Sequence, residues 1–212
     1  PFDPGAAVRR MTIVAERVRA GTPEGPAELH TLQMHLEARS SATDAEPALA
    51  VTLTAGGIDL PPGLLQNPSI AALGRRVEAL GLDGSLSGPI PLSDSIAERA
   101  ETWREGGGTL ELREVTLGWG AVRGALRMTL TLDEAMQPMG AGQLQVSGAG
   151  ELVRALVAAG VVAPRAGQAA TIAIGVMARP PEGGGPPRLD LPVTLEERRL
   201  AVGPIRLLRL AP

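Results

Sequence analysis

The two histidines, His30 and His35, are the residues best suited to acid–base or metal chemistry in this chain. In a strand their odd separation places them on opposite faces, and in a helix positions i and i+5 do not share a face. Neither arrangement lets the pair hold one metal ion, so we expect no metal site. We interpret them as one partly buried and one exposed strand histidine.

Serine-based catalysis would need a serine on a sharp turn, a base and an oxyanion hole. No G-x-S-x-G motif occurs, and in the nearest stretch, Ser147-Gly148-Ala149-Gly150, the glycines follow the serine. That stretch also begins like a dinucleotide-binding fingerprint, but Val153 stands at the third glycine position. We therefore interpret it as a strand-to-helix turn, and a hydrolase using His30 or His35 is the least favoured alternative.

Adjacent carboxylates occur at Asp133-Glu134 and Glu196-Glu197. Neighbouring side chains in turns point apart and stay solvated, unlike the paired carboxylates that flank a sugar in a glycosidase. The sequence also has no lysine, cysteine or tyrosine, which excludes P-loop lysines, Schiff bases and thiol nucleophiles. We therefore predict a protein that is not an enzyme and uses no cofactor.

The charge and the aromatic content argue against nucleic acid as a partner. The formal net charge is −3 at pH 7, and the aromatic residues are one phenylalanine and two tryptophans. Binding to a nucleic acid depends on a basic surface and, for single strands, on aromatic stacking platforms. We expect no nucleic-acid interface.

The elements that carry these residues are mostly strands. Glycine and proline are frequent, with 27 and 19 residues, but the low net charge and the many aliphatic residues indicate a folded chain. The core must then consist of Leu, Val and Ala with almost no rings. No stretch reads as a linker between independent units, so residues 1–212 are predicted to form a single β-rich domain.

Alternation of apolar and polar residues with period two is the dominant pattern. Over 122–132, Leu and Met alternate with Arg, Ala and Thr, which predicts a long strand with one apolar face. Similar alternation predicts strands at 29–38, 80–86 and 189–195, and Pro192 favours an edge position for the last of these.

Two strand predictions need a further argument. The stretch 8–18 fits either a helix or a strand, and its β-branched residues favour a strand paired with 29–39. In the strand beginning at Thr109, the apolar residues change parity after Leu112. A bulge near Arg113–Glu114 would reconcile the two halves.

Helices are predicted at three places. Ser95 and Glu98 form a capping box at the start of the first, which ends at Gly106. The second spans 151–159 before a glycine stop. The third spans 166–178 and is apolar nearly all round, so we expect it to be a buried helix, with a buried strand as the alternative.

Trp119 stands between Gly118 and Gly120, where two predicted strands meet. We interpret its ring as a corner plug that packs over the helix carrying Trp103. The alternative is an aromatic residue at a membrane interface or at the mouth of a groove.

An ordered set of segments resembles one bacterial family. Its parts are Leu117–Val122, Leu130–Asp133, the glycine-bounded stretch Gly140–Gly148, the alanine-rich helices and a closing hairpin over Leu189–Pro212. Together these resemble the DUF2125 family of alphaproteobacterial envelope proteins, over the C-terminal two-thirds of that family's length. The chain departs from it at Glu196-Glu197-Arg198, where the family has an Asp-Gly type of turn.

The resemblance implies a periplasmic domain tethered to the inner membrane, and it transfers no active-site residue. On this basis we expect the chain to be the C-terminal part of a longer, membrane-tethered protein.

We therefore predict an α+β protein, a long curved antiparallel β-sheet with two to four helices packed on one side. A wide aliphatic sheet face must be covered by helices or by a ligand. We expect a non-enzymatic periplasmic domain that binds an apolar or lipid ligand, and the alternative is a scaffold or docking module for an envelope membrane protein. The residues expected to face the ligand are Leu126, Met128, Leu130, Leu132 and Trp119.

Overall fold

The fold is known from a computed structural model of the 212-residue chain. It describes residues 8–39, 42, 46–88, 95–179, 186–203 and 205–209, and for 205–209 the backbone alone.

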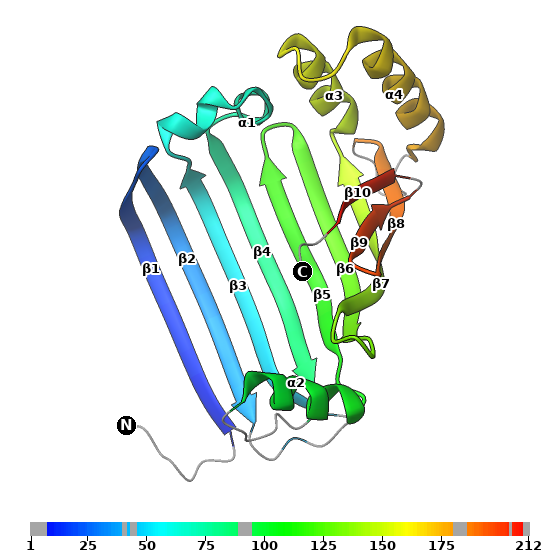
Figure 1. Cartoon of the computed structure of the whole chain (residues 1–212). Coiled ribbons are helices and arrows are strands. Elements are labelled where there is room, and N and C mark those ends of the chain that lie inside the picture. The colour runs from blue at the N-terminus through cyan, green and yellow to red at the C-terminus, as the bar shows by residue number, and fades with distance from the viewer. Residues whose placement is uncertain are drawn as a thin grey trace.

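Ten strands form one antiparallel sheet in which spatial order equals sequence order (Figure 1). Each strand therefore pairs with the strands before and after it in the chain, as in a meander. This arrangement confirms the curved antiparallel sheet of an α+β protein that the alternation predicts. The strands are β1 (Val8–Thr22), β2 (Gly25–Arg39), β3 (Pro47–Asp59), β4 (Arg76–Ser87), β5 (Leu110–Trp119), β6 (Val122–Leu132), β7 (Pro138–Ser147), β8 (Arg188–Glu196), β9 (Arg199–Val202) and β10 (Ile205–Arg209).

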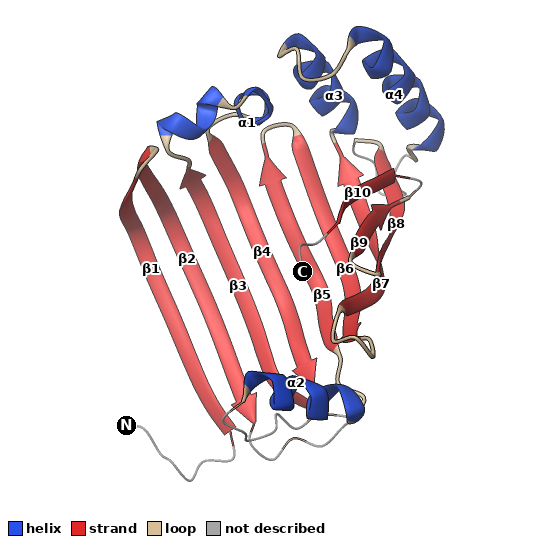
Figure 2. Cartoon of the chain, in the orientation of Figure 1, coloured by secondary structure: helices blue, strands red, loops and turns tan. Residues whose placement is uncertain are grey.

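The helices lie beyond the ends of the strands (Figure 2). They do not cover a face of the sheet, although the sequence predicts helices packed on one side of it. Each is inserted between two strands that are neighbours in the sheet, so it needs only to bridge adjacent strand ends. A short 3₁₀ helix, η1, and α1 lie at one end, α2 lies at the other, and the pair α3 and α4 projects from one corner. Their bounds are η1 Pro62–Gln66, α1 Pro68–Leu73, α2 Ile96–Glu105, α3 Ala149–Ala158 and α4 Pro164–Met177.

Both uncertain strand predictions are resolved by pairing. The N-terminal stretch is strand β1, and it pairs with β2 from Val8↔Arg39 to Thr22↔Gly25. The predicted bulge is present in β5, where the register with both neighbours shifts between Leu112 and Glu114 or Val115. Because of the extra residue, the apolar side chains before and after the bulge point to the same face of the sheet.

The sheet curls at its C-terminal side, so that β9 and β10 lie over the face of β5 and β6 (Figure 1). Here the buried side chains of Met128, Val193 and Leu195 form the main core cluster. Leu112 of β5 and Leu200 of β9 both pack against this cluster, which closes that half of the sheet on itself. β7 can bend this sharply because Gly142 lies where a Cβ atom would overlap the backbone of β6.

Pro192 does not mark an edge strand, because β8 pairs with both β7 and β9. The carbonyl of Pro192 accepts a hydrogen bond from the Gly203 amide, 2.7 Å away, just past the end of β9. In an antiparallel strand the N–H and C=O of one residue point to the same side. The nitrogen of Pro192, which has no proton to donate, therefore faces a position beyond the end of β9. No hydrogen bond between β8 and β9 is lost.

Helix α4 is a helix, but the prediction that it is buried is wrong. Ile172 and Val176 are 69% and 82% exposed, and Gly167 is its buried residue. One side of α4 packs on α3 through small residues such as Gly167, and the opposite side carries the exposed Ile172 and Val176. Apolar residues therefore occur on both sides although only one side is packed.

Candidate ligand-binding face

One face of the sheet is lined by rows of aliphatic side chains that continue from strand to strand. Residues that pair across antiparallel strands point to the same face and touch laterally. Two of these rows, with two similar rows flanking them, define what we call the apolar face. The first is Ile13, Met34, Leu53, Leu82, Val115, Leu126, Leu144 and Leu191; the second is Met11, Leu36, Val51, Gly84, Leu112, Met128, Gly142, Val193 and Val202.

The flanking rows have the same composition of aliphatic residues and glycine. One runs from Ala15 through Leu80 to Leu189, and the other from Ala38 through Leu110 to Leu200. With strands about 4.8 Å apart and rows about 7 Å apart, the apolar face measures roughly 34 Å by 20 Å. Over β1–β5, outside the part that forms the core cluster, the face is roughly 19 Å by 20 Å, about the size of the largest apolar patch of a typical soluble monomer, a patch that is often functional.

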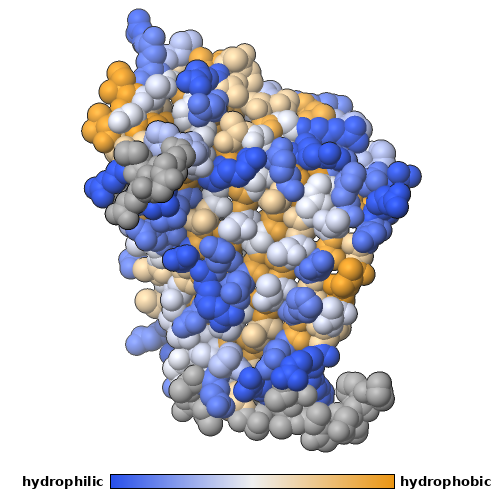
Figure 3. All heavy atoms as spheres, turned by 180° about the vertical axis from the view of Figure 1, so that it is seen from behind, coloured by the Kyte–Doolittle hydropathy of each residue, from blue (hydrophilic) through white to orange (hydrophobic). Residues whose placement is uncertain are grey.

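The opposite face is polar. Its rows contain ion pairs and hydroxyl contacts, among them Arg10–Glu37 at 3.0 Å and Thr12–His35 at 3.1 Å. Seen from behind, hydrophilic and neutral side chains cover most of this face, with apolar groups between them (Figure 3). The two faces of the sheet therefore differ in polarity.

Burial along the apolar face changes from one half of the sheet to the other. Met11 and Leu117 are 45% and 37% exposed, whereas Met128 and Val193, in the same row as Met11, are 7% and 3% exposed. In the described part of the chain no helix crosses this face, and no large side chain is completely buried. We call β1–β5 the open half and β6–β10 the closed half.

Four of the five residues expected to face a ligand lie on β6. Met128 belongs to the buried core, and Leu126 and Leu130 pack against that core, so they line the closed half. Leu132 ends the strand, where it pairs with Pro138. The larger exposed apolar area lies on the open half, which the sequence argument did not single out. The alternation of apolar and polar residues in β2 and β4 does predict an apolar face on these strands. It does not show which strands have that face covered by the rest of the protein.

Trp119 is a corner plug, but against a different helix from the one expected. Its indole Nε1 donates to the Gly74 carbonyl, 2.8 Å away, at the C-terminus of α1. Trp103 lies on α2 at the other end of the sheet, where its Nε1 donates to the Ser87 carbonyl at 2.9 Å. Each tryptophan thus fastens one helix to one end of the sheet, because the indole offers both apolar area and a hydrogen-bond donor.

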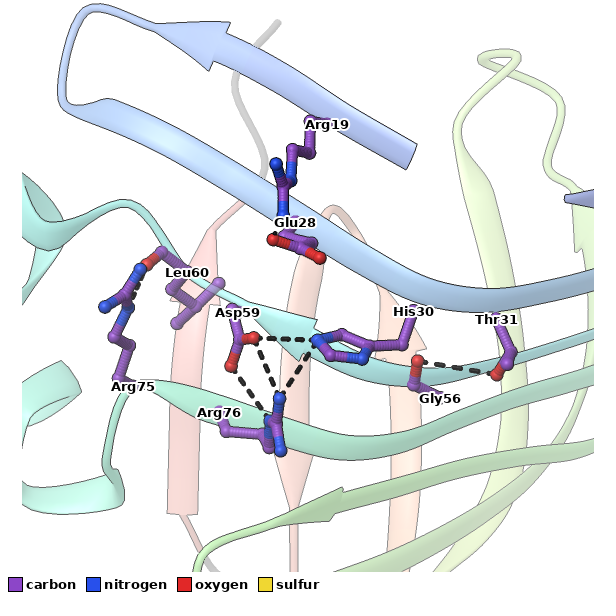
Figure 4. Close-up of polar contacts among 9 residues, drawn as sticks. All are labelled: Arg19, Glu28, His30, Thr31, Gly56, Asp59, Leu60, Arg75 and Arg76. Carbon is purple, nitrogen blue, oxygen red and sulfur yellow. Dashed lines mark hydrogen bonds and ion pairs between the residues drawn. The ribbon is translucent and has the colours of Figure 1, made fainter. Parts of the chain in front are cut away.

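A row of charges crosses the open half near α1 (Figure 4). Arg19, Glu28, Asp59 and Arg76 pair laterally across β1–β4. Arg19 and Glu28 are 3.0 Å apart, and the guanidinium of Arg76 lies 2.9 Å from each carboxylate oxygen of Asp59. The Nε2 atom of His30 is 2.9 Å from the same carboxylate.

Hydrogen bonds from Arg76, and secondly from His30, lower the pKa of Asp59 to about 2. A carboxylate that is this stable in its charged form is a poor general base near neutral pH. The Arg76 pKa is raised by the same contact. The cluster is therefore suited to tying strands β2–β4 together or to binding a polar group, and less suited to proton transfer.

The two histidines occupy separate sites. His30 contacts Asp59 and Arg76 and is partly exposed, and the exposed His35 contacts the Thr12 hydroxyl. None of these described contacts involves a serine, which a Ser–His hydrolase would need. Among the described residues no three His, Asp or Glu side chains are grouped so as to hold a metal ion.

Fold and face together define the class: an antiparallel β-sheet protein with one open apolar face and helices at the strand ends. The chain belongs to the DUF2125 family, described as an uncharacterized protein conserved in bacteria, whose family model matches residues 3–211. No curated protein and no solved structure matches it. None of the helices described is long and apolar enough to cross a membrane.

Proposed function

We propose that this chain is a non-enzymatic domain of the bacterial cell envelope that binds the acyl chains of a lipid on its apolar face. The observation that carries the proposal is the continuity of the aliphatic rows over an open half that no described helix covers. Leaving this area in water is unfavourable in proportion to its size, and a bound acyl chain would remove that cost.

The composition of the apolar face supports an acyl chain over a polar small molecule. Its rows consist of Leu, Val, Ile, Met, Ala and Gly, which offer methyl and methylene groups and no side-chain hydrogen bonds. Sites for polar ligands usually combine an apolar lining with a few placed polar groups. Among the described residues of the open half, such groups gather towards the strand ends, in the charged row of Arg19, Glu28, Asp59 and Arg76 with His30 beside it, and at Arg9 at the opposite end.

The localisation is part of the proposal. A lipid-binding face suits the periplasm, where the chain would be tethered to the inner membrane by a segment outside this sequence. Fractionation of cells carrying the tagged full-length protein tests this placement.

The binding test uses matched substitutions on the apolar and polar faces. Leu117→Asp places a charge on β5, where the open half adjoins the closed half, and Ile13→Asp places one on β1. The control is Val14→Asp, because Val14 is 63% exposed and neighbours Ile13 on the opposite face. Titration with a fluorescent long-chain fatty acid measures affinity, and mass spectrometry measures lipid that copurifies with each variant.

The expected result is a loss of about tenfold or more for Leu117→Asp, because a bound chain would have to desolvate a carboxylate. Ile13→Asp should show a smaller loss and Val14→Asp none. If wild-type protein repeatedly purifies without lipid and does not bind the probe, the proposal is wrong.

A second candidate, a docking module, is favoured by one observation. β1 is a 15-residue strand at the end of the sheet order, and no described strand pairs with its outer edge. Such an edge can accept a strand from a partner. A photo-crosslinker placed at Glu16 in intact cells should capture one dominant envelope protein under this alternative, and no single protein under the first.

A further inference from the structure

The hairpin of α3 and α4 has an exposed surface that the proposed function leaves without a role. It projects beyond the ends of β6–β8 at one corner of the molecule (Figure 1). In the view from behind, apolar groups gather at this corner (Figure 3). Because the hairpin extends past the sheet, it can meet a large flat surface without interference from the strands.

Helix α4 has two distinct sides. Gly167 on one side packs so closely on α3 that a Cβ atom would overlap Val157. Ile174 lies on this same side and is half-buried. At 100° per residue, the opposite side presents Ile172 and Val176, which are the most exposed apolar residues of the helix.

One arginine lies on the exposed stripe of α4, and a second follows the end of the helix. Arg165 is exposed and lies within about 20° of Ile172 and Val176 around the helix axis. Arg179, also exposed, lies just past the end of α4, in an extended segment that is bridged to Arg188. The apolar pair lies between the two arginines along the chain. An apolar centre with terminal arginines, which can reach upward to phosphates, is typical of helices that lie in a membrane interface.

The local charge points to an anionic surface. Residues 149–179 contain three arginines and one glutamate, and no acidic residue follows Glu151 until Glu182. The chain as a whole has a net charge of −3. The hairpin is therefore a positive region on an acidic protein, and anionic lipid headgroups attract such a region.

A second copy of the chain is a poorer occupant of this stripe. A two-fold contact between two α4 helices is self-complementary, so it would bring the arginines of both copies together. The repulsion between these charges opposes such a dimer. A protein partner would need an acidic rim, whereas an anionic bilayer supplies both the apolar interior and the phosphates.

The hairpin is also continuous with the apolar face. A cavity of about 780 Å³ lies between α4 and the strand ends, and its lining includes Ile174 and Gly175 of α4, Ala178 just after the helix, and Val146 and Leu189. Val146 and Leu189 pair with each other in a flanking row of the apolar face. The cavity thus joins the hairpin to the end of the apolar face on the closed half.

We infer that α4 docks the protein on an anionic phospholipid surface, with Ile172 and Val176 inserted among the acyl chains and Arg165 and Arg179 on the phosphates. The docking stands on the hairpin alone; the transfer of lipid to the apolar face rests on the proposed function.

The test is flotation of the protein with vesicles of phosphatidylethanolamine and phosphatidylglycerol, compared with vesicles of phosphatidylcholine. Val176→Asp and Ile172→Asp should each lower the vesicle-bound fraction about tenfold or more. The matched control is Ile96→Asp, because Ile96 is 77% exposed on α2 at the far end of the sheet, and it should float like wild type. All three residues are exposed, so folding should survive, as circular dichroism would verify.

The arginines give a separate readout. Arg165→Gln and Arg179→Gln should each weaken binding to the anionic vesicles about fivefold at low salt, and added salt should reduce the difference. Binding to phosphatidylcholine should not change.

Three outcomes would overturn the inference. Wild-type protein could fail to float, Val176→Asp could float as well as wild type, or sedimentation could reveal a wild-type dimer that Val176→Asp dissociates without vesicles. The fatty-acid titration without vesicles separates this inference from the proposed function. Val176→Asp should keep probe binding and lose flotation, whereas Leu117→Asp should lose probe binding and keep flotation.

Discussion

The open and closed halves of the sheet use the same residue types and differ in what covers them. In the closed half, β8 and β9 curl back, so Met128, Val193 and Leu195 become a core. In the open half, Met11, Ile13 and Leu117 remain partly exposed. One continuous apolar face thus forms a core where the sheet curls over it, and it stays exposed to solvent where the sheet does not.

The largest expected effect compares two methionines of one lateral row. Met128→Ala should lower the free energy of unfolding by about 2–5 kcal/mol, because it removes a buried side chain and leaves a cavity. Met11→Ala should cost less than about 1 kcal/mol, because Met11 is 45% exposed. Urea denaturation monitored by tryptophan fluorescence measures both. Equal losses at the two sites would show that the open half is covered in solution.

A smaller effect concerns pH and is confined to the open half. Asp59 has a pKa of about 2 in the folded chain against an ordinary value of 3.8. A carboxyl group whose pKa is lowered by folding stabilises the folded state above its unfolded pKa, and this contribution is lost as pH falls towards the folded pKa. Protection of β2–β4 amides should therefore decrease between about pH 4 and pH 2, beyond any loss in β6–β8.

Asp59→Asn is the control for that experiment. The variant should be less stable than wild type at pH 7, because Arg76 and His30 lose their carboxylate. Its stability should approach that of wild type near pH 2. Hydrogen exchange at several pH values measures the difference by strand, and an unchanged pH profile in the variant contradicts the role of Asp59.

The smallest effect is a gain, and it belongs to the closed half. The turn between β8 and β9 has positive φ angles at Glu197 (48°) and Arg198 (65°), a conformation that favours Asn and Gly. Glu197→Asn with Arg198→Gly should raise the free energy of unfolding by about 1 kcal/mol, because the native turn then carries less strain. Thermal unfolding measures it. An unchanged or lower melting temperature would mean that other contacts of Glu197 and Arg198 outweigh the strain.

The backbone of this turn is the one that Asn-Gly and Asp-Gly pairs favour, although its own residues are Glu197 and Arg198. Two charged residues hold the conformation that Asn and Gly adopt with less strain. The Arg199–Glu197 ion pair, at 3.3 Å, is one contact that accompanies the turn.

Much of the sheet is predictable from local pattern. Alternation of apolar and polar residues predicts β6, β8 and β2, and the parity change after Leu112 predicts the bulge in β5. These features are predictable because side-chain direction in a strand depends only on the local backbone. The capping contact of Ser95, whose Oγ accepts from the Glu98 amide, is local in the same sense.

The candidate site was less predictable. The sequence predicts that Met128 and its neighbours face a ligand, whereas the larger exposed area lies on β1–β5. It also gave no role to Asp59 and Arg76, which are 17 residues apart and meet only through the pairing of β3 with β4. Likewise, an all-apolar α4 predicts burial, although its outer side has no packing partner among the described residues.

The sequence alone determined that this chain forms long antiparallel strands with one aliphatic side, because the period of two belongs to each strand separately. Only the tertiary structure decided which part of that side is closed, where the helices lie and which stripe of α4 faces outward. Those features depend on how far the sheet curls and on which surfaces meet. Contacts between residues distant in the sequence fix both, and no local pattern encodes them.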